Sequence, residues 1–272
     1  MPHLMPEQKH LERATAEALT PREKKIWETL RQEIKGLTLD LWGTILDDTH
    51  PPTDTIVYSE QRQQFLLNEL RHAGYHISTE QVRAAYKRAW EYFDELWLQQ
   101  IAFEANDGLQ EMLKYLHAEL PHESYRRVLD FFESYKVPPL PLEGVVPAIQ
   151  NLSEKYALAL ISDTAWTPGR RLREILAEYE ILHCFHALIF SGEVGHTKPH
   201  PIMFARARAG LQLPAHECLH TGDIQRTDVA GAKAAGMRAA WIYRPVYAGK
   251  AQEDHGPDVT VASVAELAKV LL

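Results

Sequence analysis

The chain of 272 residues lacks the features that mark collagen-like, disordered, disulfide-stapled or membrane proteins. Its two cysteines, Cys184 and Cys218, cannot form a disulfide framework and favour a reducing compartment. No apolar run approaches the roughly 18 residues of a membrane-spanning helix. Residues 1–12 are charged and lack the apolar stretch of a signal peptide. We therefore expect a cytoplasmic protein with no membrane partner.

Positive charge is also scarce. The sequence has 29 Lys and Arg residues against 37 Asp and Glu residues, a formal net charge of −8. Nucleic-acid binding depends on a surplus of Lys and Arg, so we expect no nucleic-acid partner. The balance does not exclude a local cationic site for a small phosphate. Hydrophobic residues make up 45% of the chain, an ordinary globular value, and the length corresponds to about one or two domains.

Three sequence patterns divide the chain. Residues 1–35 are rich in charge and carry Ile26, Leu30 and Ile34 four positions apart, which predicts a helical N-terminal extension. Residues 50–138 are predicted to form a helical bundle, with helices near 56–74, 78–97, 108–119 and 122–135. Residues 36–49 and 139–272 alternate between strands and helices.

The helical segment is rich in aromatic residues. It holds 14 of the 25 aromatic residues of the chain, between Tyr58 and Tyr135. Four helices need a core, so we expect most of these rings to pack together. Tyr and Trp also suit the wall of a ligand site that is partly exposed to water, because each combines an apolar ring with a polar group. The sequence does not show which of the rings at 86, 90, 93 and 97 face a ligand.

The alternating region predicts an α/β fold, a doubly wound parallel sheet with helices on both faces. The expected strands are 36–42, 157–161, 187–190, 218–221, 239–243 and 259–262. The expected helices are 146–155, 169–179, 201–210, 227–235 and 264–271. In such sheets ligands bind beyond the carboxyl ends of the strands, and that is where candidate functional residues should gather.

Polar residues follow these predicted strands. Asp40 ends the first strand, Ser162 ends the second, and Lys198 precedes a proline after the third. Asp223 and Asp228 follow the fourth. Phosphoryl transfer needs positive charge and precise positioning, because negative charge spreads over the phosphoryl oxygens.

Each of these residues suits a role in that chemistry. Asp40 can attack phosphorus and form an aspartyl-phosphate. Ser162 and Lys198 can bind phosphoryl oxygens. The carboxylates of Asp223 and Asp228 suit Mg²⁺.

The order of these motifs resembles the haloacid dehalogenase superfamily, in the branch with a helical cap inserted after the first strand. The resemblance rests on DLWGT from Asp40, Ser162, KPHPIMF from Lys198, and LHTGDIQRTDVAGAKAAGM from Leu219. It implies a three-layer Rossmann-like core with a small helical cap domain at 50–138. It also implies a Mg²⁺ site formed by Asp40, the backbone carbonyl of Trp42, Asp223 and Asp228, the last directly or through water.

The resemblance further implies a phosphorylated small-molecule substrate. By their places in the motifs, four residues are assigned to phosphate binding: Gly43, Thr44, Asp163 and Thr164. His220 lies on a predicted buried strand, and packing is the favoured interpretation of its role.

One position departs from the family pattern. Family phosphatases carry a second aspartate two residues after the nucleophile, which protonates the leaving oxygen and then activates water. Trp42 stands there in this chain, and indole is neither acid nor base near neutral pH. Candidate substitutes are Asp47, Asp48, His50 or a cap residue.

Alternative functions therefore stay open beside a slow Mg²⁺-dependent phosphatase. One is a hydrolase whose leaving group needs no proton, acting on an acyl phosphate or a carbon–phosphorus bond. Another is a dehalogenase, because family dehalogenases commonly have tyrosine at the position of Trp42. The third is a non-catalytic scaffold that binds a phosphorylated ligand or a protein. The N-terminal helix and the aromatic cap are both candidate dimer surfaces.

Overall fold

The computed structural model describes residues 20–47, 58–135, 137–244 and 253–272. The first 19 residues of the predicted extension lie outside the described residues, and so do Asp48 and His50. No helix within the described ranges is long and apolar enough to cross a membrane.

Six parallel strands form one sheet in the order β3-β2-β1-β4-β5-β6. The strands are β1 (Gly36–Leu39), β2 (Ala157–Ser162), β3 (Phe185–Phe190), β4 (Cys218–Gly222), β5 (Arg238–Ile242) and β6 (Val259–Val261). The central strand β1 pairs with β2 on one side and β4 on the other. Leu39 lies opposite Leu160 and Thr221 in these two pairings. The predicted α/β fold class is confirmed, and the register brings Asp40, Ser162 and Asp223 to the same edge of the sheet.

Helices cover both faces of this sheet. They are α2 (Pro21–Glu33), α7 (Val145–Ser153), α8 (Gly169–Glu178), α9 (Ser191–Val194), α10 (Pro201–Leu211), α11 (Ala230–Ala234) and α12 (Val264–Leu271). The apolar residues of α2, α7, α8 and α12 share one buried cluster with β1. Those of α10 and α11 form a second cluster on the opposite face. Short 3₁₀ turns, Leu182–Cys184 and Ala215–Glu217, precede β3 and β4.

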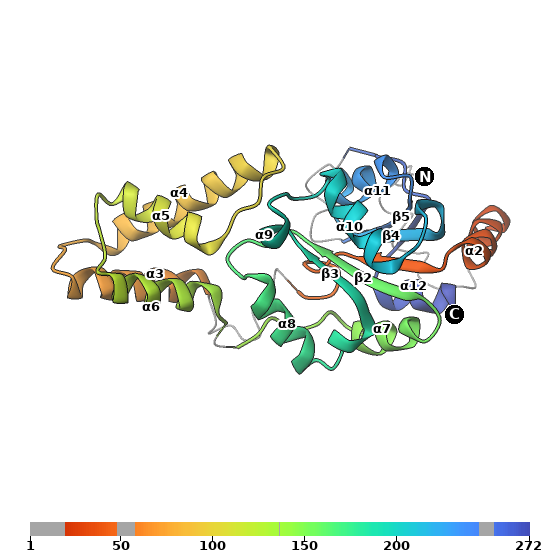
Figure 1. Ribbon diagram of the computed structural model, residues 1–272, viewed down its shortest axis with the longest axis horizontal. Helices are drawn as coiled ribbons and strands as arrows, with labels where there is room; N and C mark the ends of the chain where they lie inside the picture. The colour runs from red at the N-terminus through yellow and green to blue at the C-terminus, as the bar shows by residue number, and fades with distance from the viewer. Residues whose placement is uncertain (1–19, 48–57, 136, 245–252) are drawn as a thin grey trace, which may run out of the picture.

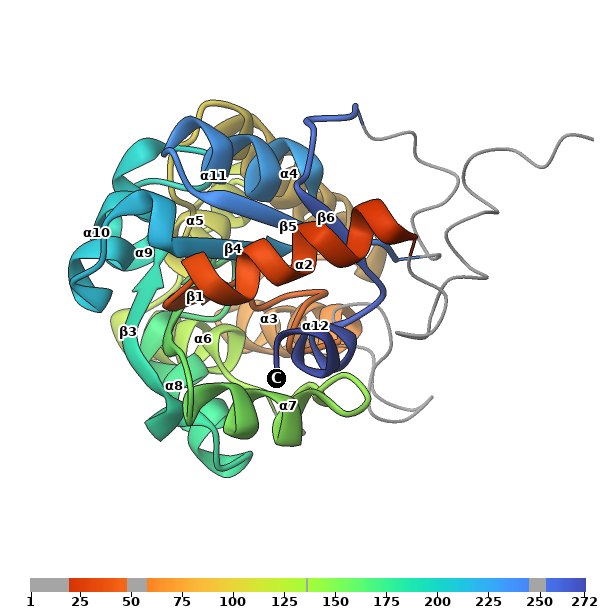
Figure 2. The same cartoon turned by 90° about the vertical axis from the view of Figure 1, so that its right-hand side faces the viewer.

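The N-terminal helix α2 docks on the core through the stripe seen in the sequence. Thr20 caps it, because its side chain accepts a hydrogen bond from the backbone N–H of Glu23. Trp27, Leu30 and Ile34 are buried in the cluster around β1. Figure 2 shows α2 lying across the end of the sheet. The described part of the predicted extension is therefore packed against the core.

Four helices stand apart from the sheet (Figure 1). They are α3 (Tyr58–His72), α4 (Thr79–Leu98), α5 (Ala105–Tyr115) and α6 (His122–Glu133). Their apolar faces form a separate buried cluster, which includes Tyr86 and Phe103. Trp166 belongs to this cluster although it follows β2 in the chain. The ring of Trp166 stacks on Tyr86 at a centroid distance of 5.2 Å. A loop of the sheet region thus inserts one large side chain among the four helices.

The predicted start of the third helix was wrong. Gly108 was expected to open it, whereas α5 begins at Ala105, where the Glu104 backbone N–H donates to Asp107 Oδ2 at 2.8 Å. Gly108 lies inside the helix, and the Trp166 ring occupies the space beside it. A β-carbon at position 108 would come within 2.4 Å of that ring. The glycine therefore serves packing and does not mark a helix end.

Candidate active site

Three buried carboxylates meet beyond the carboxyl ends of the central strands. Asp40 follows β1 and Asp223 follows β4. Asp228 lies in the π-helical turn Gln225–Val229, which leads into α11. One ligand oxygen from each carboxylate lies within 4.8 Å of the other two. The structure thus brings together three residues that span nearly 190 positions of the chain.

Lys198 joins two of these carboxylates. Its Nζ lies 2.5 Å from Asp40 Oδ1 and 2.6 Å from Asp228 Oδ1. The backbone N–H of Lys198 donates to Asp163 Oδ1 at 2.8 Å. Arg244 lies farther away, with Nη1 3.9 Å from Asp223 Oδ2. The carboxylates of Asp40, Asp163, Asp223 and Asp228 thus lie around Lys198 and Arg244. The cluster therefore keeps an excess of negative charge.

The pKa values of these groups follow from burial and mutual charge. Burial raises the pKa of Asp40 to about 7, with a further increase from Asp228 and an opposing decrease from Lys198. Burial alone would also raise the pKa of Asp228, but Lys198 and His220 outweigh it and hold that pKa below its usual range. Burial opposes the charge of Lys198, yet its carboxylate neighbours raise its pKa. A cation beside Asp40 would lower the pKa of that carboxyl group, because it favours the charged form.

His220 has a role that the sequence did not reveal. Its Nε2 lies 3.1 Å from Asp228 Oδ1 and its Nδ1 lies 2.8 Å from the hydroxyl of Thr38. All three residues are buried. His220 is buried and its ring contacts Phe204, as the packing interpretation expects, but its hydrogen bonds add a second role. The imidazole thus links Thr38 on β1 to the Asp228 carboxylate and helps to orient it.

The first loop after β1 packs closely against Asp223. Gly43 has a positive φ of 72°, and a β-carbon there would lie 2.3 Å from Asp223 Oδ2. Glycine is thus required at this position. Within the described residues, Thr44 Oγ1 and Ser162 Oγ are buried without a hydrogen-bond partner. Buried hydroxyls without partners are costly in a folded protein. Their assignment to phosphate binding stays a prediction that this observation favours.

The side chains of Asp163 and Thr164 already have protein partners. Asp163 accepts hydrogen bonds from Lys198 N and, at 3.1 Å, from Trp97 Nε1. Thr164 Oγ1 lies 3.0 Å from Ser191 Oγ and accepts a hydrogen bond from the Gly192 N–H. The backbone N–H of Thr164 also has a partner, since it donates to Ser191 Oγ at 2.8 Å. Phosphate binding by these two residues stays a prediction. The Asp163 side chain instead connects Lys198 to the last turn of α4.

Comparison with known proteins agrees with this arrangement. The family model of the haloacid dehalogenase-like hydrolases matches residues 34–236. The chain belongs to this family of hydrolases. An uncharacterized hydrolase of Schizosaccharomyces pombe is 27% identical over 74% of this chain and 87% of its own length. A phosphoserine phosphatase of Thermus thermophilus is 33% identical over 47% of this chain, and the match spans about half of that protein, 50%.

Solved structures show the same fold. A 2-haloacid dehalogenase from Pseudomonas syringae superimposes with a TM-score of 0.61, covering 88% of this chain and 98% of that one at 24% identity. An identity this low carries the fold and not the activity.

Trp42 separates this hydrolase from family phosphatases at one decisive position. Its ring is partly buried against the sheet core, and the Tyr135 ring lies 6.4 Å away at the end of α6. Of the candidate acid–base substitutes, Asp47 faces Arg244 at 3.5 Å. The position two residues after Asp40 is thus occupied by an aromatic ring covered by another.

The acidic cluster fits Mg²⁺ by the chemistry of its donors. Mg²⁺ binds hard oxygen ligands and is usually held by one or two carboxylates together with water and substrate oxygens. Asp40, Asp223 and Asp228 supply such oxygens from three separate points of the backbone. The excess negative charge described above also favours a cation there. The participation of the Trp42 carbonyl stays a prediction.

Proposed function

We propose that this hydrolase is a Mg²⁺-dependent phosphatase that acts on a small organophosphate through an aspartyl-phosphate at Asp40. The observation that carries the proposal is the convergence of Asp40, Asp223 and Asp228 around Lys198. A carboxylate nucleophile surrounded by other carboxylates repels an anionic substrate unless a cation intervenes. Bound Mg²⁺ supplies that charge neutralisation.

The protein residues divide the reaction between them. An Asp40 carboxylate oxygen attacks phosphorus while the ester P–O bond breaks and its electron pair leaves with the alcohol oxygen. Lys198 and Ser162 bind phosphoryl oxygens and hold the group in line. Water then attacks phosphorus, which releases inorganic phosphate and restores the Asp40 carboxylate.

Proton transfer is the weak step. The leaving oxygen needs a proton and the attacking water must lose one, and Trp42 can do neither. General acid–base catalysis is typically worth about 10²–10⁴-fold in rate. Turnover should therefore be slow, with a proton supplied by solvent or by Asp47, Asp48, His50 or a residue of the helical segment.

The four helices set apart from the sheet suit the role of a cap over this site. We assign residues 50–138 to the cap, 36–49 with 139–272 to the core, and 1–35 to the extension. Trp97 supports this assignment, since its Nε1–H reaches Asp163 at the edge of the site and its ring lies 4.0 Å from the Arg226 guanidinium. The free cysteines Cys184 and Cys218 accord with a cytoplasmic location.

Phosphate release from a panel of phosphomonoesters tests the proposal, in the presence of Mg²⁺ and of a chelator. We expect release that requires Mg²⁺ and disappears in Asp40→Asn. Trp42 favours a scaffold as the second candidate function. A scaffold would bind phosphate or beryllofluoride at Asp40 without turning over any ester. A dehalogenase would release halide from a 2-haloacid whether or not the chelator is present.

A further inference from the structure

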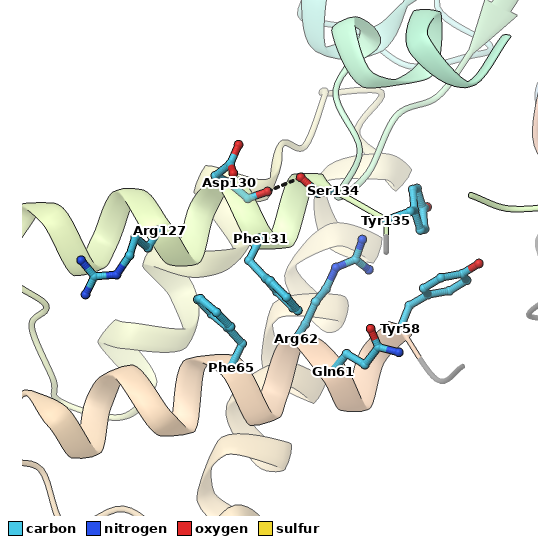
Figure 3. Close-up of a pocket in the computed structure, with 9 residues that line it drawn as sticks. All are labelled: Tyr58, Gln61, Arg62, Phe65, Arg127, Asp130, Phe131, Ser134 and Tyr135. Atoms are coloured by element: carbon cyan, nitrogen blue, oxygen red, sulfur yellow. Dashed lines mark hydrogen bonds between the residues drawn. The ribbon is translucent and has the colours of Figure 1, made fainter. Parts of the chain in front are cut away.

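The helical segment has a cavity of its own, about 420 Å³ in volume, between α3 and α6. Figure 3 shows its lining residues, which come from α3 and from residues 127–135. None of these lining residues belongs to the candidate active site. The helices instead contact that site through the end of α4 and the chain that follows it.

The chain just after α4 pairs with the loop that carries Lys198. The Thr197 N–H donates to the Gln100 carbonyl oxygen at 3.2 Å. The Ala102 N–H donates to the Gly195 carbonyl oxygen, also at 3.2 Å. The two bonds form a short antiparallel bridge. Because Thr197 immediately precedes Lys198, the bridge holds the backbone next to this lysine.

Trp97, in the last turn of α4, reaches the same loop with its side chain. Its Nε1–H donates to Asp163 Oδ2 at 3.1 Å. The other oxygen of that carboxylate, Oδ1, accepts the backbone N–H of Lys198 at 2.8 Å. Asp163 thus lies between an indole of the helical segment and the backbone of the lysine at the centre of the acidic cluster.

The ring of Trp97 also contacts the turn that carries Asp228. The central carbon of the Arg226 guanidinium lies 4.0 Å from the ring centroid, a cation–π contact. Arg226 belongs to the same π-helical turn as Asp228. One indole is therefore connected, through one residue on each side, to the two segments whose Lys198 and Asp228 side chains form a 2.6 Å ion pair.

The action of Lys198 depends on where its backbone is held. Its ammonium group lies between Asp40 and Asp228, and in the proposed reaction it also binds a phosphoryl oxygen. Lysine is a point charge on a flexible four-carbon stem, so its own side chain fixes little. A misplacement of about 1 Å in a catalytic group can lower the rate about 10²-fold. The hydrogen bond from the Lys198 N–H to Asp163 is thus part of the catalytic geometry.

We propose that Trp97 is a positioning residue for Lys198 and that it acts through Asp163. The inference rests on the proposed phosphatase function and adds a residue of the helical segment to the residues that perform it. The Trp97 N–H fixes the orientation of the Asp163 carboxylate, and that carboxylate holds the Lys198 backbone. Trp97 moves no proton itself, because indole is neither acid nor base near neutral pH.

Three variants separate the hydrogen bond from the packing of the ring. Trp97→Phe removes the N–H and keeps an aromatic ring beside Arg226. Trp97→His is smaller, but its five-membered ring can place an Nε2–H where the indole Nε1–H lies. Asp163→Asn breaks the link from the other side, because an amide has one acceptor oxygen for two donors. Loss of packing would harm Trp97→His more than Trp97→Phe, and loss of the donor would do the reverse.

Trp90→Phe is the matched control. Trp90 lies about two turns earlier in the same helix, and its ring packs against Phe93 and Trp166 among the aromatic residues of the helical segment. The substitution removes the same atoms as Trp97→Phe and leaves the bond to Asp163 in place.

Phosphate release from a phosphomonoester in the presence of Mg²⁺ measures the role of Trp97. We expect Trp97→Phe and Asp163→Asn each to lower kcat by roughly 10-fold, near the lower end of the effect of losing a hydrogen bond to a charged group. Because both break one link, their double variant should fall little further than Asp163→Asn alone. Trp97→His should retain more activity than Trp97→Phe, and Trp90→Phe should keep the native kcat.

Three kinetic results would overturn the inference. One is a native kcat in Trp97→Phe, and another is a double variant whose loss is the product of the two single losses. The third is a kcat that falls in Trp90→Phe as far as in Trp97→Phe, or is lower in Trp97→His than in Trp97→Phe, because packing then explains the effect.

Binding of inorganic phosphate separates this inference from the proposed function. With Mg²⁺ present, phosphate should raise the melting temperature of the native protein and of Trp90→Phe, relative to chloride at equal ionic strength. Trp97→Phe should need roughly 10-fold more phosphate for the same shift. If no ester is turned over but this difference appears, the phosphatase proposal fails and the positioning role stands. Equal shifts in the native protein and Trp97→Phe would overturn that role whatever the turnover. A native protein with neither turnover nor a phosphate shift would overturn both.

Discussion

Two buried cations, one in each half of the molecule, are held in opposite ways. Lys198, at the edge of the sheet, is 2% exposed and contacts carboxylates of Asp40 and Asp228. Arg62, among the separate helices, is 6% exposed and contacts a backbone carbonyl and two aromatic rings. The sheet edge has more anions than cations, which favours the binding of a cation. In the helical segment, no carboxylate of the described residues pairs with Arg62.

The largest expected effect comes from removing one carboxylate partner of Lys198. Asp40→Asn keeps the size of the side chain and removes the nucleophile, so phosphate release should fall by at least about 10³-fold. Phosphate release in the presence of Mg²⁺ measures the change. Asp94→Asn, which alters an exposed carboxyl group of α4, is the control and should leave the rate unchanged. Substantial activity in Asp40→Asn would remove Asp40 from its proposed role.

A carboxylate at position 42 would add a fourth acidic side chain beside the cluster of Asp40, Asp223 and Asp228. Trp42→Asp should raise turnover by up to about 10²-fold, because it supplies the missing acid–base group. The same substitution removes the contact with Tyr135 and should lower stability. Trp42→Asn shares the packing loss without the acid–base group, so the difference in kcat between the two variants measures proton transfer. Equal kcat values would show that position 42 is not where the proton moves.

Loss of the hydrogen bond between His220 and Asp228 should have a smaller effect. His220→Phe keeps a buried ring and removes the hydrogen bond to Asp228. We expect Mg²⁺ affinity to fall by about 10- to 100-fold, as for other groups that orient metal ligands. Mg²⁺-dependent melting shifts report this affinity without any need for turnover. Phe204→Leu alters a buried ring that contacts His220 but leaves that hydrogen bond in place. If both variants lose Mg²⁺ affinity equally, packing explains the effect and orientation of Asp228 does not.

The last expected effect is on stability and not on activity, and it is a pH dependence. Burial raises the pKa of Asp40 from its ordinary 3.8 to about 7, so without metal the folded state binds a proton that the unfolded state releases in this interval. Native stability should therefore decrease as pH rises from about 4 to 7, relative to Asp40→Asn, by on the order of 3 kcal/mol. Melting temperatures of both proteins in chelator, across this pH range, measure the difference. A flat difference would show that Asp40 titrates at its ordinary pKa, and added Mg²⁺ should reduce the slope.

The candidate site in the sheet region was largely predictable, because the backbone of the sheet alone brings its residues together. Parallel strands end at one edge, so the order of Asp40, Ser162, Lys198 and Asp223 along the chain was enough to predict their meeting. The confirmed fold class follows from the same alternation of strands and helices. What local patterns could not show was His220, whose partners Thr38 and Asp228 lie on other elements.

The helical region was less predictable because its contacts depend on side-chain packing between distant segments. The aromatic content correctly indicated a core, and Tyr86 packs in it. No pattern announced that Trp166 would enter this core from the sheet region or that Gly108 would make room for it. An arginine near the start of a helix ordinarily lies on the surface, so Arg62 gave no signal of its burial.

Mass spectrometry of the acid-quenched protein, after mixing with Mg²⁺ and a phosphomonoester, tests the central claim most directly. The account predicts one added phosphoryl group on the peptide that contains Asp40. Because Trp42 cannot activate the water that hydrolyses the aspartyl-phosphate, this adduct should accumulate, and it should be absent in chelator and in Asp40→Asn. Phosphate release from the native enzyme with no adduct on that peptide, or an adduct that forms equally well in chelator, would contradict the account.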